Sequence, residues 1–216
     1  MNFGHDVGDI SMELEQALTE LREEKERKFK QSVDLIVNLK GVDLRKTKVN
    51  VVITIPHKIK EKKVCGFLTE KNELVQTITK PDFKKYREKT ALKNLVNNFD
   101  FFIAHGSLMP SVASTFGQVL GPAGKMPSPQ LGIVMTESSE DIKNVLEKIS
   151  KSVKIRAKEA SIKVSVGKEN MSDEEISANV KAIYGGIVKA LPTKKENVKN
   201  VFIKFTMGKP KEIEIK

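Results

Sequence analysis

The N-terminal part of the chain changes from a helical to a strand-like pattern of hydrophobic positions. Between Ile10 and Leu21, hydrophobic residues recur at steps of three and four among Glu and Lys residues, which predicts an amphipathic helix. Over residues 33–39, hydrophobic and polar residues alternate, as in a strand with one buried face. A second strand is expected over residues 49–55, ended by Pro56.

The central part of the chain has a different pattern of hydrophobic positions, in which short apolar runs alternate with helical patterns. The runs cover residues 64–68, 99–104 and 131–135, and the clearest helical patterns cover residues 86–96 and 140–149. Strands separated by helices favour a parallel sheet with helices on its faces. This part is therefore predicted to form a three-layer, Rossmann-like α/β unit.

The C-terminal part again shows the kind of hydrophobic pattern seen in the N-terminal part. A strand is expected over residues 161–166, and a helix that begins with a capping box is expected over residues 172–190. The strands of a hairpin are expected over residues 198–206 and 211–215, because a Gly- and Pro-containing turn separates them.

The two outer parts do not supply a convincing core separately. We therefore predict that residues 1–62 and 158–216 form one discontinuous, two-layer α+β domain, with an α/β domain of residues 63–157 inserted in it. The charged connector over residues 58–63 marks the first crossing between them. Two chain crossings make a natural hinge.

The net charge of the chain indicates which classes of binding partner it favours. The 216 residues include 38 Lys and Arg against 28 Asp and Glu, a formal net charge of +10. This excess favours nucleic acid or an anionic membrane surface, although an ordinary basic protein would also show it. No apolar run approaches the roughly 20 residues of a membrane span, and the first residues lack a signal peptide's apolar core. With a lone cysteine, Cys65, the chain is expected to be cytoplasmic and not membrane-bound.

Side chains suited to catalysis or metal binding are sparse. His5, His57 and His105 are scattered, and a single His at a strand end is more often a hydrogen-bonded turn residue than a general base. No Cys/His cluster has the spacing of a zinc site. We expect neither an enzyme nor a bound cofactor or metal.

The sequence GPAGK at residues 121–125 is similar to a phosphate-binding loop but departs from it at two positions. A Walker A loop has glycine five residues before its Gly-Lys pair and a hydroxyl residue after the lysine, where this chain has Val119 and Met126. We interpret residues 117–129 as a Gly/Pro-rich loop, either a structural turn or a backbone-rich surface facing RNA phosphates.

Two short segments are candidates for contact with RNA. Phe29 lies between Lys28 and Lys30 at a strand start, where it either closes the core or packs on a ribose or base while the lysines reach phosphates. Thr206-Met207-Gly208 predicts a compact corner whose hydroxyl and backbone N–H groups can approach RNA, because glycine removes the side-chain obstacle. Alone, the triplet is only a hairpin turn.

Five segments, in this order along the chain, carry a family resemblance. They are Lys28-Phe29, Ile55-Pro56-His57, residues 120–127 (LGPAGKMP), Val166-Gly167-Lys168 and Thr206-Met207-Gly208. Together they resemble the large-subunit ribosomal protein one family in its archaeal form, and the resemblance runs through essentially the whole chain. Bacterial members have a His where Lys163 stands here.

The resemblance implies a structural protein that binds a stalk of large-subunit rRNA and forms the mobile side stalk near the tRNA exit site. It further implies assistance in releasing deacylated tRNA, binding to its own mRNA leader or coding region to repress translation, and a monomer when free. The implied RNA-binding residues all lie in the outer domain: Lys28, Phe29, Ser32, Lys46, Lys163, Lys168, Thr206, Met207 and Gly208.

Two alternatives stand beside this interpretation. The first is an RNA-binding translational regulator acting mainly off the ribosome, which would use the same surface. The second is a nucleotide-dependent enzyme built on the central α/β part, against which the imperfect phosphate loop already argues.

Overall fold

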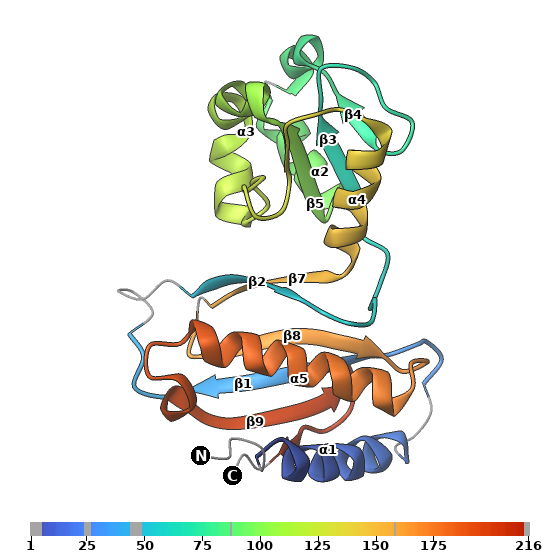
Figure 1. Cartoon of the computed structure of the whole chain (residues 1–216), viewed down its shortest axis with the longest axis vertical. Helices are drawn as coiled ribbons and strands as arrows, with labels where there is room; N and C mark the ends of the chain where they lie inside the picture. The colour runs from blue at the N-terminus through green and yellow to red at the C-terminus, as the bar shows by residue number, and fades with distance from the viewer. Residues whose placement is uncertain (1–5, 24–26, 44–48, 87, 158, 214–216) are drawn as a thin grey trace. The chain divides into compact units, whose positions relative to one another are not determined.

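The computed structural model describes residues 6–23, 27–43, 49–86, 88–157 and 159–213. The chain folds into two compact units (Figure 1). The outer unit is Met1–Ile59 with Val153–Lys216, and the inserted unit is Lys60–Ser152. The chain therefore passes between the units twice.

The outer unit is built on an antiparallel sheet whose central strand comes from the N-terminal arm. β1 (Ser32–Leu39) pairs with β8 (Ser161–Lys168) on one side and with β9 (Val198–Phe205) on the other. β10 (Lys211–Ile213) pairs with β9, giving the order β10-β9-β1-β8. A separate pair joins β2 (Asn50–Thr54) to β7 (Ser152–Arg156). The expected strands and the C-terminal hairpin are thus confirmed over the described residues, and residues 214 and 215 of the last expected strand lie outside them.

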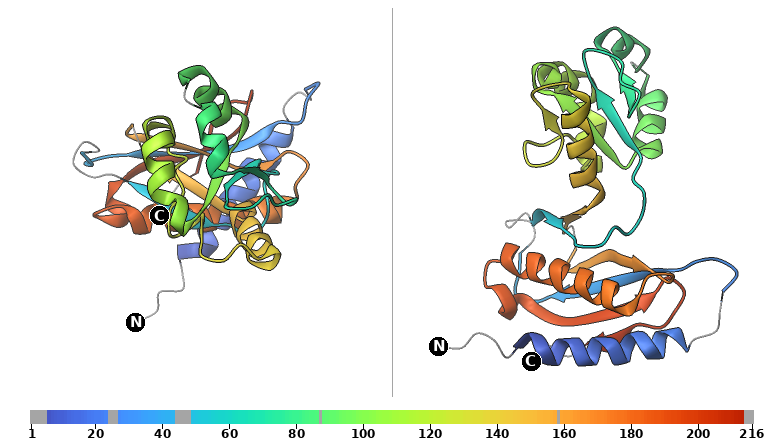
Figure 2. Two further views of the ribbon diagram at one scale, coloured as in Figure 1. Left: turned by 90° about the horizontal axis from the view of Figure 1, so that it is seen from above. Right: turned by 45° about the vertical axis from the view of Figure 1, so that its right-hand side comes forward.

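One face of this sheet is covered by helices α1 (Asp6–Arg22) and α5 (Asp173–Ala190), and η3 (Lys194–Asn197) precedes β9. Every second residue of β1 is buried against these helices, as the alternating sequence predicts. The capping box at the start of α5 forms as expected, with Ser172 and Glu175 each bonded to the other's backbone N–H. Figure 2 shows α5 lying along the strands. The shared core consists of Leu14, Leu18, Leu21, Val33, Leu35, Val37, Ile176, Val180, Ile183 and Ile187, among others.

A buried amide fixes the segment that leaves β2. The Asn179 side chain on α5 donates to the carbonyls of His57 (3.1 Å) and Val166 (2.9 Å), and it accepts from the His57 N–H (3.0 Å). Asn179 and Val166 are fully buried, so the bond to the Val166 carbonyl satisfies a backbone group that water cannot reach. The backbone N–H and carbonyl of His57 are therefore both hydrogen-bonded.

The inserted unit contains a four-stranded, wholly parallel sheet in the order β4-β3-β5-β6. On one face, Phe102 and Ala104 are buried with α2 and α3, whereas Ile103 is buried on the other face with α4. Helices thus cover both faces. The elements are β3 (Val64–Phe67), β4 (Gln76–Ile78), η1 (Lys80–Tyr86), α2 (Lys89–Asn98), β5 (Phe101–His105), η2 (Gly106–Leu108), α3 (Met109–Ala123), β6 (Ile133–Val134) and α4 (Ser139–Ser150).

The interpretation of residues 117–129 as a loop was wrong for their first half. Helix α3 continues to Ala123 and ends at Gly124, whose φ of 72° is left-handed. Pro122 is accommodated in the last turn because Gly121 before it has no Cβ to collide with the proline ring. The helix expected over residues 86–96 begins later than predicted, at Lys89, since Tyr86 belongs to the preceding 3-10 turn.

Lys125 has a structural partner. Its ammonium donates to the carbonyls of Val96 and Phe99, both at 2.7 Å, at the C-terminal end of α2. A cation is favoured there by the helix dipole and by carbonyls that lack partners within the helix. Lys125, which follows the end of α3, therefore contacts the end of α2.

Within the described residues, no helix combines the length and apolar character needed to cross a membrane.

Replacing Asn179 with Ala should leave the buried Val166 carbonyl and the partly buried backbone groups of His57 without their hydrogen-bond partner. We expect the free energy of unfolding in urea to fall by about 1–3 kcal/mol, the cost of a buried unsatisfied polar group. Lys181→Ala on the exposed side of the same helix is the control and should change stability by less than about 0.5 kcal/mol. Equal losses in both variants would contradict the role given to the amide.

Replacing Lys125 with Met keeps the aliphatic stem but removes the donor to Val96 and Phe99. We expect a loss of about 2 kcal/mol, in the range for hydrogen bonds to charged groups. Lys93→Met, on the exposed face of α2, is the matched control. Guanidinium unfolding checks this, and unchanged stability of Lys125→Met would show that the ammonium does not hold α3 to α2.

Candidate nucleic-acid interface

The second face of the outer sheet is the candidate interface. Along β1, the residues between the core positions are only partly buried. Ile36 of this outward set lies opposite Lys163 of β8 and Phe202 of β9, and Asp34 lies opposite Lys204. Cross-strand partners point to the same face. This face therefore carries two lysines beside two hydrophobic side chains.

Ser32 and Thr206 join at one end of this face, where β1 begins and β9 ends. The Ser32 N–H donates to the Thr206 hydroxyl oxygen (3.0 Å), and the Thr206 N–H donates to the Ser32 carbonyl (3.0 Å). The Thr206 hydroxyl also lies 3.2 Å from that carbonyl. The hydroxyl that we expected to approach RNA thus fixes the corner.

The backbone around Met207 is held equally firmly. The Met207 N–H donates to the buried Gln31 side chain (3.1 Å), and the Gly208 N–H closes the turn onto the Phe205 carbonyl (3.0 Å). The Met207 side chain itself is 59% exposed. A large apolar side chain is therefore presented to solvent from a rigid backbone.

Phe29 is likewise exposed, at 52%, so it does not close the core. It lies two residues before Gln31, which joins this segment to the end of β8. The Gln31 N–H donates to the Glu169 carboxylate (2.9 Å), and the Glu169 N–H donates to the Gln31 carbonyl (3.0 Å). Lys168 lies opposite Ser32. The corner, as named here, thus consists of Ser32, Lys168, Thr206, Met207 and Gly208, with Lys28 and Phe29 in the exposed segment that leads into Gln31 and Ser32.

Arg22, at the end of α1, secures the turn after β8. Its guanidinium donates to the Asp173 carboxylate (2.8 Å) and to the carbonyls of Glu169 (3.0 Å) and Met171 (2.8 Å). The planar fork of arginine suits such multiple contacts. The corner is therefore supported from α1 and α5 as well as from the sheet.

Two of the predicted residues lie apart from the corner. Lys163 pairs with Ile36, four positions along β1 from Ser32, which places it about 14 Å away at the usual rise per residue. Lys46 lies outside the described residues.

Sequence reasoning missed Gln31 and Asp34 as parts of this site, which also includes Lys204. Burial raises the pKa of the Asp34 carboxyl, and the neighbouring Lys204 ammonium offsets part of that rise. The alternation along β1 was the available signal, because it places Asp34 on the face opposite the core. Nothing in the sequence indicated the contact between Gln31 and Met207.

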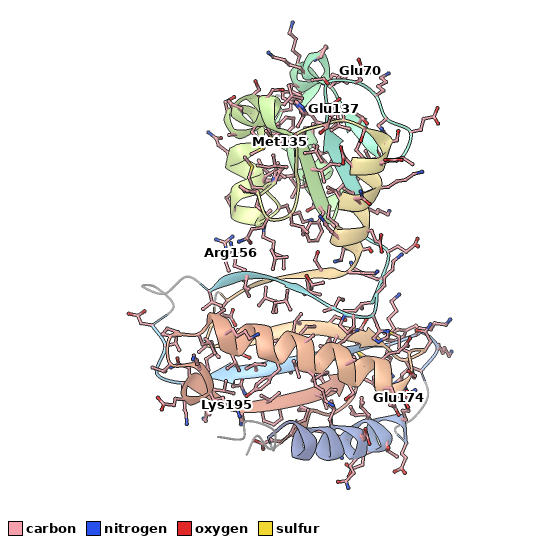
Figure 3. The ribbon with its side chains drawn as sticks, viewed as in Figure 1. Glu70, Met135, Glu137, Arg156, Glu174 and Lys195 are labelled. Atoms are coloured by element: carbon pink, nitrogen blue, oxygen red, sulfur yellow. The ribbon has the colours of Figure 1, made fainter. Side chains whose placement is uncertain are left out.

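The carboxyl ends of the strands in the inserted unit hold groups that could suggest an enzyme, since open α/β sheets bind ligands there. The His105 ring lies 2.6 Å from the Ser107 hydroxyl and 3.0 Å from the Met135 carbonyl. The Glu137 carboxylate accepts hydrogen bonds from the Thr69 N–H, the Thr69 hydroxyl and the Glu70 N–H. Glu70, Met135 and Glu137 are labelled in Figure 3. Internal partners thus already occupy these groups.

The electrostatics of the inserted unit agree with a structural role. Burial alone would raise the pKa of Glu137, but the hydrogen bonds from Thr69 and Glu70 hold it below its usual value. Burial raises the pKa of the Cys65 thiol to about 12, so it is not an activated nucleophile. In the part of the chain that the structure describes, no three His, Cys, Asp or Glu side chains gather as metal ligands would.

Comparison with known proteins places these features in a family. The model of the Ribosomal protein L1p/L10e family matches residues 21–209, which include the inserted unit, most of the outer unit and every predicted RNA-binding residue.

Similar proteins cover most of the chain. Relatives named large ribosomal subunit protein uL1 include those of Pyrobaculum islandicum, 36% identical over 88% of this chain and 87% of its own length, and of Pyrobaculum aerophilum, 34% identical over 89% of each. The relative from Thermoplasma volcanium is 34% identical over 96% of this chain and 97% of its own length. These relatives confirm the expected resemblance to archaeal ribosomal proteins rather than to enzymes. The chain belongs to the Ribosomal protein L1p/L10e family.

Proposed function

We propose that this chain is a structural, rRNA-binding protein of the large ribosomal subunit and that it binds through the corner of its outer unit. The observation that carries the proposal is that two exposed apolar side chains, Phe29 and Met207, adjoin one hydrogen-bonded segment. The Met207 N–H donates to the side chain of Gln31, two residues after Phe29, and the next residue, Ser32, bonds to Thr206 and lies opposite Lys168. Leaving such side chains in water forgoes the free energy of burial, so they favour a partner.

RNA fits this arrangement better than a protein surface. Aromatic side chains stack on unpaired bases, and lysines reach phosphates and make affinity depend on salt. The chain's net charge of +10 acts in the same direction. In this proposal the corner recognises the shape of a folded RNA, while Lys28, Lys163 and Lys168 supply electrostatic attraction.

The family supports a more specific proposal. The RNA is a stalk of large-subunit rRNA near the tRNA exit site, and the protein, with that stalk, assists the release of deacylated tRNA. Binding to its own mRNA would use the same corner and repress translation. The protein acts in the cytoplasm on the ribosome and is a monomer when free.

We also propose that the two units are the two domains expected from the sequence, residues 1–62 with 158–216 and residues 63–157. The two compact units of the fold support this, with crossings after Ile59 and Ser152. The parallel order β4-β3-β5-β6, with helices on both faces, supports a Rossmann-like inserted domain. The two crossings would then act as the hinge of the mobile stalk.

Phe29→Ala should weaken binding to the rRNA stalk fragment by about 5- to 150-fold, as expected when a base loses its aromatic stacking partner. Met207→Ala should also weaken it, because an exposed apolar contact with the RNA is lost. Both side chains are exposed, so stability should change by less than about 0.5 kcal/mol. Met135→Ala and Leu74→Ala are matched controls, because these side chains are exposed on the inserted unit. Wild-type affinity in the Phe29 and Met207 variants would exclude the corner as the binding site.

The whole proposal is checked by binding to the stalk fragment and to an equally long control RNA over a salt series. We expect a preference for the stalk fragment that persists as salt rises, because shape-specific contacts add to the phosphate attraction. If both RNAs bind equally and binding vanishes steeply with salt, the protein has only a general affinity for polyanions. Co-sedimentation with large subunits at moderate salt would separate a ribosomal protein from a regulator acting off the ribosome.

A further inference from the structure

A pocket of about 350 Å³ lies along β7 and β8 of the outer unit, away from the corner. Buried Ile155 and Ile162 contribute apolar walls. Three cationic side chains and one carboxylate line the same pocket: Lys154, Arg156, Lys163 and Glu159. The pocket therefore has an excess of two positive charges.

The cations come from neighbouring strands. Lys154 and Arg156 are alternate residues of β7, so their side chains leave the same side of that strand, and Lys163 belongs to β8. Figure 3 shows the Arg156 side chain extending from β7. Within the described residues, neither Lys154 nor Lys163 forms an ion pair. Lys154 is half-buried.

This arrangement places like charges close together in partial shelter from water. Burial first, and then the nearby Arg156 guanidinium, lower the pKa of Lys154. An anion in the pocket would relieve both effects, because it neutralises the repulsion and replaces lost hydration. Ser161 adds a hydroxyl to the lining. β8 also forms one edge of the four-stranded sheet, and edge strands present backbone N–H groups that can donate to phosphate oxygens.

We propose that this pocket holds a phosphate group of the RNA backbone, bound by Lys154, Arg156 and Lys163. The proposal rests on the proposed function and extends it, since it adds a second point of contact to the corner. Lys163 lies both in the pocket and on the outward face of the sheet, opposite Ile36. It links the two sites across about 14 Å, a distance over which a nucleic-acid helix carries several phosphates.

Two contacts at this separation have different roles. The corner supplies shape-dependent recognition, whereas the pocket takes a group present in every nucleotide. The pocket would therefore strengthen binding and set the orientation of the RNA without reading its sequence. The apolar walls suit the backbone sugar next to the phosphate, and Glu159 at the lining disfavours a second phosphate.

The test compares two double variants of equal charge. Lys154→Gln with Arg156→Gln removes the pocket cations, and Lys181→Gln with Lys189→Gln removes two exposed lysines of α5. Binding to the stalk fragment and to the control RNA is measured over a salt series. We expect the slope of log K against log salt to become shallower by about one more for the pocket double than for the control double.

Equal slopes for the two doubles would overturn the pocket and leave the proposed function intact. If the wild-type protein does not prefer the stalk fragment, the proposed function fails. The difference in salt slope between the two doubles, measured on either RNA, still tests whether the pocket binds phosphate. Melting temperatures of all variants are compared first, and Lys154→Gln alone replaces the pocket double if that double does not fold.

A second experiment identifies whether the bound phosphate belongs to RNA or is a free anion. Inorganic phosphate is titrated into the wild-type protein and into Lys154→Gln while the amide NMR signals of Ile162 and Lys163 are followed. Weak shifts that the variant loses, together with the slope difference on RNA, support the proposal. Tight phosphate binding without any slope difference on RNA would assign the pocket to a free anion and overturn it.

Discussion

The outer unit depends on the pairing of β1 between β8 and β9, two strands that follow the entire inserted unit in the sequence. β1 supplies the centre of the sheet, and its inward residues are the surface on which α1 and α5 pack. Without β8 and β9, those residues have no backbone partners and only part of their apolar neighbours. The two parts of the outer unit, Met1–Ile59 and Val153–Lys216, therefore depend on each other for stability.

The same pairing builds the candidate interface. Ser32 lies between Lys168 on one neighbouring strand and Thr206 at the end of the other, so the antiparallel register alone brings two distant sequence segments together. Gln31 and Arg22 then fix the turns on either side. A site made in this way is preorganised: its exposed side chains are carried by backbone that is already hydrogen-bonded, and little ordering is left for the moment of binding.

The sequence predicted those features that local patterns determine. Alternation identified β1, the capping box identified the start of α5, and alternating runs identified a parallel sheet. It failed at α3, where glycine and proline are typical of a loop but the helix continues to Ala123 because Gly121 accommodates Pro122. It also could not reveal contacts made over long separations. The hydrogen bonds of Asn179 and Lys125 and the support that Gln31 gives to Met207 depend on which elements meet in space.

The discontinuity of the outer unit also has a consequence for the order of events during synthesis. The inserted unit is continuous in sequence, and its parallel sheet can close over both faces as soon as α4 has been made. β1 is made earlier, but its first partner, β8, follows the whole inserted unit and its second partner, β9, comes later still. Until β8 has been translated, the valines and leucines of β1 have no strand to pair with, and such a segment associates with other chains. Nascent chains of this protein are therefore vulnerable to aggregation during synthesis of the inserted unit.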